Sequence, residues 1–286
     1  MLHTLGELAP KKAGDAKPLI QGGGRADTAQ LGSLQASIHL GLSWLFGLFF
    51  IASVYFLVAG KGTSVTTGYT FGTTSFDPTT QTSQFHVALT GDSSNAPSEV
   101  VVPLYCALGC VAHALASWAY VQYTDLWTPD GSVRVLVSAS VVPLVVIQLA
   151  LTVHMVDIEK ITMVGFLALA GVVADGVAAS LVQGGHKRLL VWLLYTVSTG
   201  FWLVVWVVLW TNAGWEEANA EDTGIQSITF TAFVIVYVLC ALNRLYLALF
   251  VWKYPSKLVS LRALELSQNF VPFVVGLFLS LITFTA

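Results

Sequence analysis

Seven apolar segments, each about as long as a helix that crosses a lipid bilayer, constrain the fold of this chain more than any other feature. A spanning helix needs about twenty mostly apolar residues. Only 10% of the 286 residues are charged, whereas a soluble domain carries about a quarter. The sequence therefore predicts an all-α integral membrane protein whose seven transmembrane helices cover residues 36–59, 100–123, 134–156, 161–182, 189–211, 225–252 and 263–285.

The connections between these segments predict one domain with one long loop. Residues 1–32 are polar and contain a run of glycines, and we expect them to form a flexible cytoplasmic tail. Residues 33–286 form the transmembrane domain, in which short turns at 157–160 and 184–188 make the third, fourth and fifth helices antiparallel neighbours. The loop at 60–99 is rich in Thr, Tyr, Phe and Val, which favour strands. We expect a β-hairpin there, lying on the membrane surface.

The placement of lysine and arginine predicts the orientation, because these residues are enriched in loops on the inner side of a membrane. With the N-terminus inside, the outer loops hold only Lys61 and Lys160. We therefore predict that the C-terminus and the loop at 60–99 lie outside. The pattern fits a plasma membrane and an organelle membrane equally. The basic residues of the inner side are Lys11, Lys12, Lys17, Arg25, Arg134, Lys187, Arg188, Lys253, Lys257 and Arg262.

Several polar side chains fall inside the predicted spans, where they are costly and therefore candidates for function. We favour a structural network, in which Arg244 pairs with Glu265 or with Asp175 so that no buried charge is left alone. A proton-bearing or water-filled network is the alternative, because histidine titrates near neutral pH. The candidates lie toward the inner half of the bundle and are His39, His113, Ser117, Asp175, Asn243, Arg244, Glu265 and Ser267.

Three tryptophans at four-residue spacing, Trp202, Trp206 and Trp210, form a stripe along one predicted helix. Such a stripe can line a ligand pocket or a dimer face. Tryptophans in membrane helices more often pack against lipid or neighbouring helices. We therefore favour packing, with Trp210 in the aromatic belt at the membrane interface.

The sequence contains none of the common catalytic or metal-binding motifs. Cys106, Cys110 and Cys240 lie in apolar runs and are interpreted as packing residues rather than as disulfides or metal ligands. We find no glycine-rich nucleotide loop, no Cys or His pair at metal spacing and no nucleophile beside a general base. We also find no basic patch that would suit nucleic acid. We therefore expect a protein that is not an enzyme and binds neither metal nor nucleic acid.

Four local stretches occur in the order and spacing of one known family. They are "IHLGLS" around His39, "GCVAHALAS" around His113, "RVLVSASVVPLVVIQLALTVHMVDI" at 134–158 and "ALNRLYLALFVWKY" around Asn243. Together with seven spans, an inner N-terminus and a long strand-like first loop, they resemble the heliorhodopsins, an inverted family of seven-helix microbial rhodopsins. The likeness runs from about residue 33 to the end of the chain. It implies a rhodopsin-like bundle that assembles as a homodimer.

The chain departs from this family at the residues that hold retinal. Heliorhodopsins attach retinal through a Schiff base to a lysine in the seventh helix, four residues after a serine. The matching serine is Ser267, which places Val271 at the lysine position, and an alignment without a gap places Val275 there. The family's carboxylate counter-ion falls at Val137. Because a Schiff base needs an amine, we expect no covalent retinal and no other covalent cofactor.

Three functions follow from these observations as alternatives. The favoured one is a non-enzymatic membrane interaction, regulatory or signalling component. Its partners would be the lipid bilayer, a second copy of the chain bound through the outer hairpin and helices four and five, and an unidentified protein. The second is non-covalent lipid or retinoid binding, which would need an apolar cavity near Val271, Val275 and Val137. The third is a small-solute or ion pathway through the inner polar zone, past His113 and Arg244.

Overall fold

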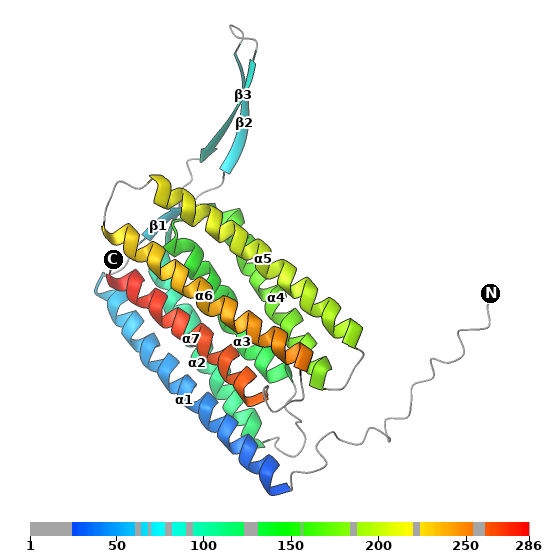
Figure 1. Cartoon of the computed structure of the whole chain (residues 1–286). Coiled ribbons are helices and arrows are strands. Elements are labelled where there is room, and N and C mark those ends of the chain that lie inside the picture. The colour runs from blue at the N-terminus through cyan, green and yellow to red at the C-terminus, as the bar shows by residue number, and fades with distance from the viewer. Residues whose placement is uncertain are drawn as a thin grey trace, which may run out of the picture.

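Seven helices and two pairs of short strands make up the computed structural model of the protein (Figure 1). The structure describes residues 25–60, 64–67, 70–77, 82–89, 94–122, 131–155, 157–183, 188–219, 224–253 and 261–285. The helices are α1 (Arg25–Val58), α2 (Ser98–Gln122), α3 (Gly131–Thr152), α4 (Ile158–Gln183), α5 (Arg188–Asn219), α6 (Gly224–Lys253) and α7 (Leu261–Thr285).

Each of the seven helices contains a segment long and apolar enough to cross a membrane, so the chain is an integral multi-pass membrane protein. The prediction of an all-α fold with seven spans is confirmed. Two helices continue well past the predicted spans: α1 begins at Arg25 and α5 ends at Asn219. The 34 residues of α1 make a helix of about 51 Å, whereas the hydrocarbon core of a bilayer is about 30 Å thick. The polar turns therefore extend beyond the hydrocarbon.

Helices that follow one another in the chain lie side by side, and α7 returns to contact α1, α2, α3 and α6. The contacts of α4 with α3 and with α5 agree with the antiparallel neighbours predicted from the short turns. The core between the helices contains large side chains that are almost fully buried, among them Tyr105, Leu209, Phe233 and Leu279.

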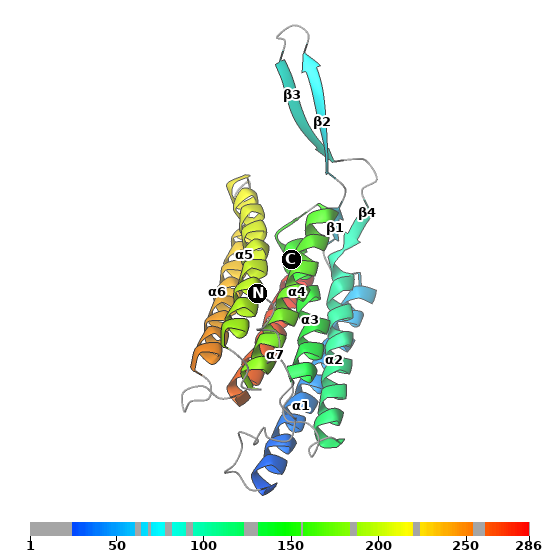
Figure 2. The same ribbon diagram turned by 90° about the vertical axis from the view of Figure 1, so that its right-hand side faces the viewer.

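Short strands lie in the connection between α1 and α2. The strand β1 (Ser64–Thr67) pairs antiparallel with β4 (Ser94–Pro97), and β2 (Thr70–Asp77) pairs antiparallel with β3 (Thr82–Leu89). The pair of β2 and β3 extends away from the ends of the helices (Figures 1 and 2). We had expected these strands to lie on the membrane surface. Antiparallel main-chain pairing joins β2 to β3 over the full length of both strands. The side of the membrane on which these strands lie stays a prediction.

The connection between α3 and α4 lies earlier in the chain than predicted, because α3 ends at Thr152 and α4 begins at Ile158. The amide of Met155 donates to the carbonyl of Ala150, 3.0 Å away, and the exposed His154 takes a left-handed conformation with φ of 52°. This arrangement is a Schellman motif, which ends α3 at Thr152 instead of residue 156. The carboxylate of Asp157 then caps α4 by accepting from the amide of Glu159, 3.0 Å away.

Polar side chains tie the bundle together at several helix contacts. The hydroxyl of Tyr105 in α2 donates to the carbonyl of Gly276 in α7, 2.6 Å away. The amide of Gln148 in α3 donates to the hydroxyl of Thr283 in α7, 2.6 Å away. At the same end of the bundle as the α3–α4 turn, the amide of Asn212 in α5 donates to the carbonyl of Val153, 2.6 Å away. These bonds fix α7 against α2 and α3, and α5 against the turn.

Candidate functional site

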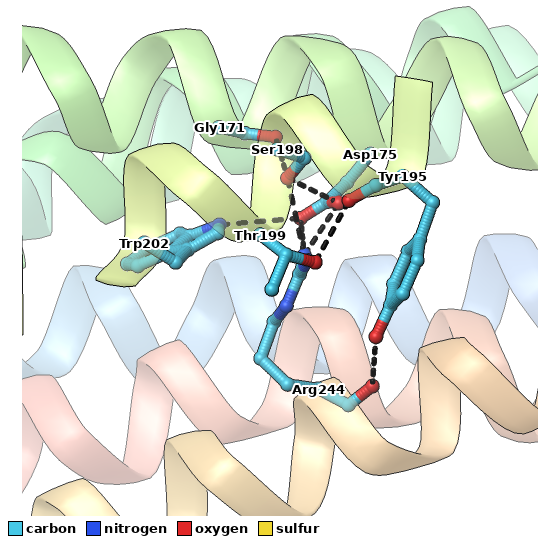
Figure 3. A network of polar contacts seen from close by, with 7 residues as sticks. All are labelled: Gly171, Asp175, Tyr195, Ser198, Thr199, Trp202 and Arg244. Atoms are coloured by element: carbon cyan, nitrogen blue, oxygen red, sulfur yellow. Dashed lines mark hydrogen bonds and ion pairs between the residues drawn. The ribbon is translucent and has the colours of Figure 1, made fainter. Parts of the chain in front are cut away.

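An ion pair joins Asp175 in α4 to Arg244 in α6 inside the bundle (Figure 3). One guanidinium nitrogen of Arg244 contacts both carboxylate oxygens of Asp175. Both side chains are largely buried, with exposed fractions of 17% for Arg244 and 11% for Asp175. The pairing of Arg244 with Asp175 is one of the two that the sequence left open. The side chain of the other candidate, Glu265, lies outside the described residues.

Side chains of α5 complete the surroundings of the pair (Figure 3). The hydroxyl of Ser198 lies 2.5 Å from the nearer carboxylate oxygen of Asp175, and the indole nitrogen of Trp202 donates to the other oxygen at 3.3 Å. The second guanidinium nitrogen of Arg244 donates to the hydroxyl of Thr199, 2.6 Å away. Because each charge has an opposite charge and hydrogen bonds, the pair is electrically neutral and links three helices.

Two of the α5 partners, Ser198 and Thr199, were not among the predicted residues. Ser198 and Thr199 are adjacent polar residues near the middle of α5, in a stretch that is mostly apolar. That position is a usable signal, because polar groups at membrane depth need partners. The sequence could not reveal which charged residue they would contact, since this depends on how α4, α5 and α6 are rotated about their axes.

The predicted histidines lie elsewhere, between α1 and α2. The Nδ1 atoms of His39 and His113 are 2.9 Å apart, so one ring donates to the other. The hydroxyl of Ser117 donates to the carbonyl of Ala36, 2.8 Å away. Val137, the predicted counter-ion position, is buried beside this pair of helices, in a cluster with Ala36 and two alanines of α2. The predicted polar zone is therefore divided between two places in the bundle.

A cavity of about 100 Å³ lies among five helices, α3 to α7, beside the ion pair. An engineered cavity of about 150 Å³ in another protein binds benzene, so this space alone is of the size of a small apolar molecule, and a longer ligand would need the helices to move apart. Both candidate lysine positions, Val271 and Val275, line this cavity, whereas Val137 does not. Its other lining residues are Val135, Ser138, Val142, Val145, Val146, Leu149, Val172, Asp175, Gly176, Trp202, Trp206, Val236, Cys240, Asn243, Arg244, Leu247, Gln268 and Pro272.

The cavity is elongated and has one polar end. From Val135 to Leu149 its wall follows α3 for about 21 Å. The polar lining residues Asn243 and Gln268 and the ion pair lie in the halves of α4, α6 and α7 that are predicted to face inward. Toward Leu149 the lining is apolar. The shape and polarity therefore match an elongated molecule with one polar group.

The tryptophan stripe of α5 faces inward. Trp202 and Trp206 line the cavity. Trp206 and Trp210 both pack edge-on against Tyr237 of α6, with ring centroids 5.0 and 5.3 Å apart. Trp210 thus packs between helices, as we favoured for the stripe. Trp202 and Trp206 instead line a cavity, which was the alternative.

The remaining predicted residues have simple positions. Asn243 lines the cavity, and its buried amide oxygen has no hydrogen-bond partner in the structure. Ser267 is half-buried near the start of α7. Cys106, Cys110 and Cys240 are free thiols, and Cys240 lines the cavity. Within the described part of the chain, no three potential ligand side chains gather where they could hold a metal ion.

Comparison with known proteins relates the fold to the microbial rhodopsins. The structure is similar to the crystal structure of thermophilic rhodopsin, with a TM-score of 0.55 over 91% of this chain and 94% of that chain. The two sequences are 11% identical, so the similarity concerns the fold alone. No family model matches the sequence, and no curated protein matches it. The chain is therefore a seven-helix membrane protein with a microbial-rhodopsin-like fold.

Replacing Gly171 by alanine should disturb the wall of this cavity. A Cβ atom at Gly171 would lie 2.7 Å from the indole nitrogen of Trp202, so the ring would have to move away from Asp175. We expect a loss of stability of about 1–3 kcal/mol and a change in tryptophan fluorescence, measured by thermal unfolding and emission spectra in detergent. Gly200→Ala is the control, because a Cβ there meets no atom within 4 Å. Equal stability of the two variants would contradict the close packing of Trp202 on α4.

Proposed function

We propose that the chain is a heliorhodopsin-like membrane protein that holds an apolar ligand non-covalently in the cavity lined by the five helices α3 to α7. In this proposal the N-terminus lies inside, the protein works as a homodimer, and the bound ligand regulates contacts with a protein partner rather than undergoing catalysis. One observation carries the proposal: the cavity is lined by both Val271 and Val275, the two alternative positions of the missing lysine.

The lining explains why such a ligand would be held without a covalent bond. The sequence of α7 contains no lysine, and a Schiff base needs an amine. The valines at both positions add apolar surface to the wall instead. Apolar contact is the main source of affinity in sites that bind small apolar molecules. The loss of the amine is thus consistent with a binding site that keeps its place in the bundle and changes its mode of attachment.

The ion pair beside the cavity offers a means of regulation. Trp202 both lines the cavity and donates to Asp175, so a ligand that contacts this ring also contacts the link between α4, α5 and α6. A ligand shifts a protein between conformations only by its different affinity for each. Contact with Trp202 supplies such a difference if α5 moves. A pathway past both His113 and Arg244 receives less support, because His113 lies between α1 and α2.

The test uses absorption spectra of the purified protein with all-trans retinal, with and without borohydride. We expect a retinoid band shifted from that of free retinal and no reduced covalent adduct. Val271→Trp should abolish the shifted band, because the larger ring fills the cavity. Leu281→Trp is the matched control on the same helix: Leu281 is 54% exposed on the outer face of the bundle, and this variant should keep the band.

Three results would overturn the proposal. Free-retinal absorption in the wild-type protein, together with no lipid retained by mass spectrometry of the extracted protein, would remove the ligand site. A covalent adduct in the wild-type protein would show that a lysine outside α7 binds retinal as a Schiff base. Loss of the shifted band in Leu281→Trp to the same degree as in Val271→Trp would place the binding site away from the cavity.

A further inference from the structure

We infer that the ligand of this cavity is an elongated alcohol, whose hydroxyl group donates a hydrogen bond at the end formed by Asn243 and Gln268. The inference rests on the proposed function and specifies the head group that the site selects. It follows from two acceptors at one end of the cavity, the neutral charge of the ion pair beside them and the apolar lining of the other end.

The first acceptor is the side chain of Asn243. Its amide oxygen is buried and has no hydrogen-bond partner, although the residue lines the cavity. A buried acceptor without a donor is unfavourable, and a ligand hydroxyl would supply the donor. A hydroxyl group also accepts, so it suits this amide in either of its two orientations. An aldehyde can only accept and therefore cannot satisfy the amide oxygen.

The second acceptor is the main-chain carbonyl of Gln268 in α7. In a helix this carbonyl would accept from the amide four residues later, which here belongs to Pro272. Proline has no N–H, so the carbonyl of Gln268 lacks its helical donor. Gln268 and Pro272 both line the cavity. A group that donates a hydrogen bond is therefore favoured on the α7 side as well as on the α6 side.

The charges at this end argue against an anionic head group. Arg244 is the cation that lines the cavity, and Asp175 already neutralises it. Thr199 takes a further guanidinium donor of Arg244, and Tyr195 lies against the guanidinium, with its ring centroid 4.8 Å from Cζ. A carboxylate ligand would thus add a buried negative charge beside Asp175 without a free counter-charge, which is unfavourable.

The rest of the cavity fits an apolar chain. Beyond the polar end its wall includes Val142, Val145 and Leu149 of α3 and Trp206 of α5. This part runs along the helix axes, so an extended chain would lie parallel to the helices with its hydroxyl group toward Gln268. Contact with Trp206 gives the chain an aromatic surface and gives the experiment a fluorescent reporter.

Three retinoids with the same chain and different head groups test the inference: retinol, all-trans retinal and retinoic acid. Their dissociation constants are measured in the same detergent by quenching of tryptophan fluorescence. Quenching that persists in the Val271→Trp variant, whose cavity is filled, reports binding elsewhere and is subtracted. We expect retinol to bind about tenfold more tightly than retinal and retinoic acid, because it alone is neutral and donates a hydrogen bond.

Two variants separate the contribution of each acceptor. Asn243→Leu keeps a side chain of similar size and should reduce the preference for retinol over retinal to about twofold or less, with the affinity for retinal unchanged. Pro272→Ala returns a donor to the carbonyl of Gln268 and should reduce the preference by about threefold. Leu242→Ala is the control, because Leu242 is 57% exposed on the outer face of α6.

The outcomes distinguish this inference from the proposed function. Equal affinities for the three retinoids, or tighter binding of retinal or retinoic acid, would overturn the inference and leave the ligand site in place. An unchanged preference in both Asn243→Leu and Pro272→Ala would also overturn it. Failure of all three retinoids to bind would overturn the proposed function for this ligand class and the inference with it.

Discussion

Replacing Arg244 by leucine should destabilise the bundle by about 3–5 kcal/mol, the range found when one member of a buried ion pair is removed. The substitution leaves the carboxylate of Asp175 in α4 without its counter-charge, although Ser198 and Trp202 still contact it. Thermal unfolding of the purified protein in detergent, followed by circular dichroism, would measure the loss. The reason for so large an effect is that an isolated charge at membrane depth has no water to solvate it.

The double variant Asp175→Leu with Arg244→Leu is the control for this prediction. Because it removes both charges, it should recover most of the stability lost in Arg244→Leu. Asp175→Leu alone should be destabilised to a similar extent as Arg244→Leu alone. A loss below about 1 kcal/mol in both single variants would mean that the charges are solvated and that the pair does not link the helices.

Replacing Val271 by lysine should convert the cavity into a site for covalent retinal. Val271 lines the cavity and is half-buried, so a longer side chain has space to enter it. An amine there can form a Schiff base with an aldehyde. We expect the variant to yield a visible band with all-trans retinal and, after borohydride reduction, a covalent adduct detected by mass spectrometry. The wild-type protein should yield no adduct, so the expected difference is between none and a stoichiometric amount.

Two further lysine variants test whether position decides this result. Val275→Lys places the amine at the other candidate position, which also lines the cavity but is only 3% exposed. We expect a smaller yield there, because a lysine would overpack a buried site. Leu281→Lys places the amine on the exposed face of α7 and should produce no shifted band. A shifted band in Leu281→Lys equal to that in Val271→Lys would contradict the role of the cavity.

The sequence predicted the helices because the length of an apolar run is a local property. Seven runs gave seven spans, and the errors lie at the ends. The helix α1 begins at Arg25 because polar residues can continue a helix beyond the hydrocarbon. The length of the apolar run does not indicate where such a polar extension begins. His154 takes a left-handed conformation that usually favours glycine, and α3 ends just before it. Because the residue is not a glycine, the sequence did not predict this helix end.

The site could be predicted only in part, because it depends on how the helices are rotated against each other. The sequence limited the partners of Arg244 to Glu265 and Asp175, and only the packed bundle shows the contact with Asp175. Val137 was expected near the two valines of α7, but α3 turns it toward α1 and α2. The cavity arises from side chains of five helices that are distant in the sequence, so no single segment indicates it.

The hydrogen bond from Asn212 to the carbonyl of Val153 has a consequence for how the bundle could open around a ligand. It pins α5 to the α3–α4 turn, next to the apolar end of the cavity, while the polar residues lie at the opposite end. At that opposite end the ion pair joins α5 and α6 to α4, so these three helices are expected to move together relative to α7. A molecule entering this cavity would therefore separate α5 and α6 from α7 at the Asn243 end, and the loops on that side would report its presence.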